Sequence, residues 1–67
     1  MYKYKVGYLS GPDDIFVKEC RVKAHSARTA EMLCREERDV YDITYIIKLN
    51  GGVVGYDEVL FEQGKED

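Results

Sequence analysis

The side chains best suited to covalent chemistry in this 67-residue sequence are two cysteines and the single histidine, Cys20, Cys34 and His25. A cysteine beside a histidine can form the thiolate that attacks an electrophile. However, the residue patterns around Cys20 and Cys34 place both thiols on faces that point into a core, where thiols are inert. Their spacing also lacks the pattern of a structural zinc site. We therefore expect no enzyme activity, no metal and no cofactor, and we expect both thiols to be reduced.

The second half of the chain is rich in carboxylates, which could bind a basic protein. Residues 36–67 carry nine acids and three bases, a charge of −6, whereas residues 1–35 carry seven bases and four acids, a charge of +3. The acids do not follow the spacing of a calcium loop. Carboxylates on a small rigid surface can imitate DNA phosphates and attract a DNA-binding protein, although a simply solvated acidic surface is the alternative. The residues predicted to bind protein are Glu36, Glu37, Asp39, Asp42, Asp57, Glu58 and Glu62.

Basic residues alternate along the first part of the chain and suggest a second function. Such a stripe could contact phosphates, and a tyrosine beside it could stack on an unpaired base. Glu19 interrupts the stripe, and the whole chain has a net charge of −3. Lysines on outer strand faces also discourage edge pairing between molecules. Nucleic-acid binding is therefore the second hypothesis, and its candidate residues are Lys3, Tyr4, Lys5, Arg21 and Lys23.

The elements that must position these residues can be predicted from periodicity. Alternating apolar residues indicate strands, and apolar residues three and four apart indicate a helix. The predicted elements are strands at 2–9 and 15–24, a helix at 27–38, and strands at 41–49 and 53–61. Ser26 is the predicted N-cap of the helix, Asn50–Gly52 the predicted hairpin turn, and 62–67 a predicted frayed tail.

The strand at 41–49 has the clearest alternation. It is expected to place Ile43, Tyr45, Ile47 and Leu49 on one face, with Thr44, Ile46 and Lys48 on the other. Six tyrosines in the chain suit half-buried strand positions, a protein interface or stacking on bases.

The order ββαββ predicts one two-layer α+β domain, in which a four-stranded sheet carries one helix on one face. The first two strands should pair antiparallel because a short loop joins them. One helix cannot cover four long strands, so part of the sheet is left open or is covered by another molecule, and we expect a homodimer. The sequence has no apolar run of signal-peptide or bilayer-spanning length, so we expect a soluble cytoplasmic protein that does not bind membranes.

In its size, its tyrosine and acid content and its ββαββ order, the chain resembles the small early proteins of lytic bacteriophages of Gram-positive hosts. This resemblance implies direct binding to a host protein in the host cytoplasm, in some cases by imitating DNA. The leading hypothesis is a non-enzymatic protein that inhibits a basic, nucleic-acid-binding host protein. A nucleic-acid-binding sheet and a structural or assembly subunit are the alternatives.

Overall fold

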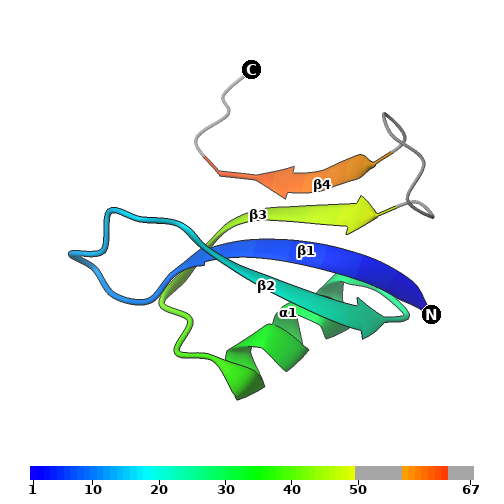
Figure 1. Ribbon diagram of the computed structural model, residues 1–67, viewed down its shortest axis with the longest axis horizontal. Coiled ribbons are helices and arrows are strands. Elements are labelled where there is room, and N and C mark those ends of the chain that lie inside the picture. The colour runs from blue at the N-terminus through cyan, green and yellow to red at the C-terminus, as the bar shows by residue number, and fades with distance from the viewer. Residues whose placement is uncertain (50–56, 64–67) are drawn as a thin grey trace.

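A computed structural model describes residues 1–49 and 57–63 of the chain. Its elements are the strands β1 (Tyr2–Leu9) and β2 (Lys18–Ala24), the helix α1 (Ala27–Glu37), and the strands β3 (Asp42–Leu49) and β4 (Glu58–Glu62). The strands form one sheet in the order β2-β1-β3-β4, and each neighbouring pair is antiparallel (Figure 1). The predicted α+β fold with ββαββ order is confirmed.

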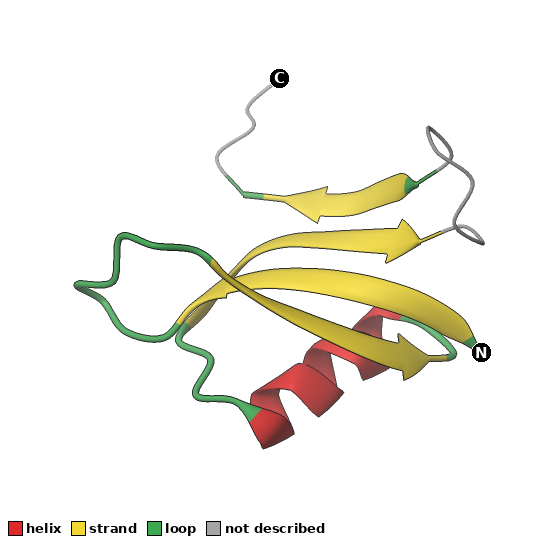
Figure 2. Cartoon of the chain, in the orientation of Figure 1, coloured by secondary structure: helices red, strands yellow, loops and turns green. Residues whose placement is uncertain are grey.

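The helix lies against one face of the sheet, as the sequence predicts (Figure 2). Since β2 and β3 both run antiparallel to β1, they are parallel to each other, and α1 connects them across the sheet. The helix packs mainly against β2 and β1, and β4 lies farthest from it (Figure 1). We call the opposite face of the sheet, turned away from α1, the open face.

Small side chains allow close packing of α1 on the sheet. Ala30 and Cys34 are fully buried on the helix, and Cys20 and Ala24 face them from β2. The predicted alternation in β1 is also correct, and it places three buried side chains in the same core: Tyr4, Val6 and Tyr8. Burying such apolar area is the main stabilising contribution in a domain of this size.

The start of the helix agrees with the sequence. The Ser26 hydroxyl accepts a hydrogen bond from the Thr29 backbone N–H at 3.2 Å, so it satisfies one of the free donors of the first turn. The helix ends at Glu37, and the Arg38 N–H donates to the Cys34 carbonyl at 2.9 Å.

The predicted alternation in β3 is correct from Tyr45 to Leu49 but wrong for Ile43, which lies on the opposite face from Tyr45. Tyr8 of β1 lies opposite Ile43 and Gly7 lies opposite Tyr45, so Thr44 has no partner on β1 and forms a bulge. One extra residue inverts the parity of the strand. Consequently Ile46 shares the helix-facing core with Ile43, and the open face receives Tyr45, Ile47 and Leu49.

Several boundaries also differ. Residues 15–17 do not belong to β2, which begins at Lys18, and β3 begins at Asp42. Glu62 and Gln63 were predicted to lie in a frayed tail, but Glu62 ends β4 and the Gln63 N–H donates to the Thr44 carbonyl at 2.7 Å. The predicted turn at Asn50–Gly52, the start of the predicted last strand and the tail at 64–67 lie outside the described residues.

Candidate functional site

The loop between β1 and β2 is organised by one carboxylate. Asp14 accepts hydrogen bonds from the Ser10 N–H at 3.1 Å, the Ser10 hydroxyl at 2.8 Å and the Phe16 N–H at 3.2 Å. It also forms an ion pair with Lys18. Together these contacts, with the Lys18 ammonium as the largest cause, hold the pKa of Asp14 well below its ordinary value of 3.8. A charged Asp14 therefore holds both ends of this loop together.

The loop presents three consecutive apolar side chains to solvent. The exposed fractions are 81% for Ile15, 74% for Phe16 and 51% for Val17. The alternation of residues 15–24 predicts a strand that begins at Ile15, which is wrong for residues 15–17. Asp14 binds the backbone N–H of Phe16, which draws this segment into a turn ahead of the sheet. Adjacent exposed apolar side chains on an ordered loop are typical of a contact site.

More exposed groups lie at the same end of the sheet. Tyr41 is 59% exposed, and its N–H donates to the Leu9 carbonyl at 2.7 Å, which ties it to the end of β1. Figure 1 shows the 10–17 loop at the left of the view, the C-terminal end of α1 below and apart from it, and the chain rising from the helix to the start of β3. We use the name loop end for the exposed residues at this end of the sheet, which are Ile15, Phe16, Val17, Glu36, Glu37, Asp39 and Tyr41.

The seven predicted acidic residues do not form one surface. Glu36, Glu37 and Asp39 belong to the loop end. Asp42 and Glu62 lie where β3 begins and β4 ends, and Asp42 accepts a hydrogen bond from the Gln63 side-chain amide at 2.9 Å. Asp57 and Glu58 lie at the other end of β4, because that strand runs antiparallel to β3. The distances between these acids along the sequence do not predict that they lie in three separate places.

Four of the five predicted nucleic-acid-binding residues do lie together, on the open face. Lys3 is opposite Lys23, and Lys5 is opposite Arg21, whose Nε donates to Glu19 Oε2 at 2.8 Å. Tyr4 is the exception: it is only 3% exposed and packs in the helix-facing core, so it cannot stack on a base.

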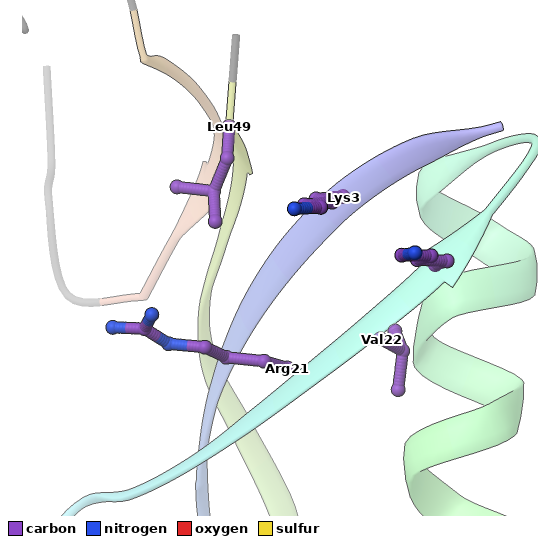
Figure 3. A pocket seen from close by; sticks show the side chains of 5 residues that line it. Lys3, Arg21, Val22 and Leu49 are labelled. Carbon is purple, nitrogen blue, oxygen red and sulfur yellow. The ribbon is translucent and has the colours of Figure 1, made fainter. Parts of the chain in front are cut away.

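A shallow hollow lies at this group of cations. It measures about 290 Å³ and is lined by Lys3, Arg21, Val22, Lys23 and Leu49 (Figure 3). Three of its five lining residues carry positive charge and none carries negative charge, so the hollow suits an anionic group.

The groups considered for catalysis are not brought together in a usable form. Cys20 and Cys34 are both buried, whereas His25 is exposed. Burial, together with the neighbouring Cys20, raises the pKa of Cys34 well above its ordinary value of 9.0. Such a thiol stays protonated at neutral pH and is a poor nucleophile. Within residues 1–49 and 57–63, no group of three or more potential ligand side chains could hold a metal ion.

Comparison of the chain with protein-family models, with curated proteins and with solved structures finds no match. In the part of the chain that the structure describes, no helix has the length and apolar character required to cross a bilayer.

Proposed function

We propose that this protein is a non-enzymatic binding module that attaches to a basic protein through the loop end. The observation that carries the proposal is the set of three exposed apolar side chains, Ile15, Phe16 and Val17, on a loop held by Asp14. The exposed carboxylates of Glu36, Glu37 and Asp39 lie at the same end of the sheet, where α1 ends and the chain leads into β3. The partner that fits this chemistry has an apolar pocket rimmed by lysine or arginine.

The two kinds of side chain would contribute differently to binding. Large apolar and aromatic anchors that enter a pocket usually supply most of the affinity of an interface, so Phe16 and Tyr41 are the expected anchors. Surrounding carboxylates mainly accelerate association with a basic partner and select against acidic ones. Because the hydrogen bonds of Asp14 already order the loop, less conformational entropy is lost on binding.

Inhibition is the activity that we propose for this binding. A basic surface is the kind of surface with which proteins bind nucleic acid, and the loop end would occupy it. The resemblance to early bacteriophage proteins supports this proposal, because several of those proteins inhibit host machinery by direct binding.

The test is affinity capture from a Gram-positive bacterial lysate with matched variants of the full chain. We expect a basic nucleic-acid-binding protein that binds the wild type and is lost with Phe16→Ser and with Glu36→Lys/Glu37→Lys. The control is Met32→Ser, because Met32 is similarly exposed (54%) but lies on α1 outside the loop end. If every captured protein bound all three variants as well as the wild type, the loop end would not be the binding surface.

A further inference from the structure

The open face carries a row of apolar side chains that no other part of the described chain covers. Tyr45, Ile47 and Leu49 lie along it on β3, and Val59, which is 55% exposed, lies opposite Ile47 on β4. Antiparallel sheets with one solvated face usually place polar residues on that face. Here α1 covers the other face (Figure 2), so the apolar row has no cover within the described chain.

Positive charge borders this row on one side. Lys3 and Lys23 are cross-strand neighbours, and so are Lys5 and Arg21. Like charges directly opposite each other on a sheet are destabilising. Arg21 is paired with Glu19, so the pair of Lys3 and Lys23 is the unfavourable one on this face. An anionic group in the hollow between Lys3, Arg21 and Lys23 would relieve that repulsion (Figure 3).

Negative charge lies on the same face, on the other side of the row. Glu62 of β4 is opposite Tyr45, which places it on the open face. Asp42 lies opposite Leu9 at the start of β3, and its alternation with the buried Ile43 places it on the open face too. The open face therefore runs from four cations and the single carboxylate of Glu19 on β1 and β2, over an apolar centre on β3, to carboxylates where β3 begins and β4 ends.

We propose that the open face is the interface of a symmetric homodimer, in which a second copy of this chain covers the first. In this dimer the two-fold axis runs parallel to the plane of the sheet and passes above the apolar row. The row of one copy then lies against the same row of the other copy. If the axis is also perpendicular to the line that joins Lys23 and Glu62, the rotation exchanges the two ends of that line. Glu62 of each copy then lies over the cationic hollow of the other. Because a two-fold interface is isologous, each favourable contact is made twice.

The size of the molecule agrees with this arrangement. It measures 35 × 30 × 17 Å, so each broad face is large enough for the roughly 800 Å² per partner of a standard interface. Pairing through the edge strand β4 is less favourable. Antiparallel pairing of two β4 strands about Leu60 would set Glu58 of one copy opposite Glu62 of the other, and like charges oppose each other there. The residues of the loop end are not part of the interface, so this proposal is independent of the proposed function.

Sedimentation equilibrium on charge-reversed variants tests the dimer. Variant A is Lys3→Glu/Lys23→Glu, and variant B is Glu62→Lys. In a homodimer of A or of B, like charges meet at both contacts, so we expect self-association at least about tenfold weaker than in the wild type. In an equimolar mixture, the heterodimer of A and B has opposite charges at both contacts, and association should return. Arg28→Glu, on the exposed side of α1, is the matched control and should dimerise like the wild type.

A second measurement keeps the proposal falsifiable if one variant fails to fold, which circular dichroism would reveal. The wild-type dimer should dissociate more readily as salt is added, because its charge pairs are screened. A wild type that stays monomeric at all accessible concentrations would overturn the proposal. A mixture of folded A and B that remains monomeric would do the same. If the monomer instead shifted a single-stranded DNA in a gel and variant A did not, the open face would be a nucleic-acid site.

Discussion

At the scale of single residues, Gly7 determines how the centre of the open face packs. The ring of Tyr45 occupies the space where a side chain at Gly7 would lie, in contact with the position of its Cβ. The burial that results, and to a lesser extent Glu19, raises the pKa of the Tyr45 hydroxyl above its ordinary value of 10.0. A glycine in the middle of a strand costs conformational entropy, and here it makes room for an aromatic ring from the neighbouring strand.

Gly7→Ala should therefore lower the free energy of unfolding by about 1–3 kcal/mol, the usual cost of overpacking. Urea unfolding at one fixed protein concentration measures it. Gly11→Ala is the control, because nothing lies within 4 Å of the position of its Cβ, and it should change stability by less than about 0.5 kcal/mol. Equal effects of the two substitutions would mean that the Tyr45 ring moves away without cost.

A second prediction at this scale concerns the buried thiol of Cys34. Since burial raises its pKa above 9.0, the folded protein holds this proton more tightly than the unfolded chain does. Its contribution to stability is complete below about pH 9 and declines as the pH rises from there toward the raised value. At pH 8 the thiol should react with an aromatic disulfide reagent only after denaturant is added. Rapid labelling of Cys34 in the native protein, measured by mass spectrometry, would contradict its burial.

At the scale of elements, the helix depends on its N-cap. Ser26→Ala removes the acceptor for the Thr29 N–H and should lower the free energy of unfolding by about 1 kcal/mol, whereas Ser26→Asp keeps an acceptor there and should stay close to the wild type. Thermal unfolding followed at a helix-sensitive wavelength distinguishes the two. Loss of stability in both variants would show that the hydroxyl has another role.

The loop between β1 and β2 carries a prediction for pH. The pKa of Asp14 is lowered in the folded protein, so the interactions of its carboxylate are complete above about pH 3.8 and are lost as the pH falls from there through the lowered value. The amide resonances of Ser10 and Phe16 should therefore keep their native positions to a lower pH than an ordinary aspartate would allow. In Asp14→Asn both resonances should move already at neutral pH, and in Asp13→Asn neither should. Unchanged resonances in Asp14→Asn would show that the loop is ordered by other contacts.

The same elements show where sequence reasoning succeeds. Alternation correctly predicted β1, and the Ser26 cap and helical spacing correctly predicted α1, because both signals depend on neighbours close in sequence. Alternation failed at the start of β3, because the bulge at Thr44 puts Ile43 on the opposite face from Tyr45 and depends on pairing with a distant strand. Alternation also failed at 15–17, where the Phe16 N–H donates to the Asp14 side chain instead of to a neighbouring strand.

At the scale of the whole molecule, the bases of the first half of the sequence and the acids of the second half are distributed differently in space. Four cations from the first half share the open face, as their alternation predicts, since β1 and β2 are neighbours joined by a short loop. Of the nine acids in the second half, the seven that the structure describes are divided among three places, because their positions depend on the strand order β2-β1-β3-β4. That order is set by long-range pairing and could not be predicted from the pattern of residues along the chain.

If the open face joins two copies, the stability of the fold must depend on protein concentration. Mass action favours the folded dimer over two unfolded chains, so the Tm of the wild type should rise by a few degrees for each roughly tenfold increase in concentration. Leu49→Glu adds a charge to the partly exposed apolar row, and its folded monomer should have a Tm that is independent of concentration. Differential scanning calorimetry at several concentrations measures both. A wild-type Tm that does not change with concentration would mean that folding is complete in a single chain, and that the apolar row is stable in contact with water.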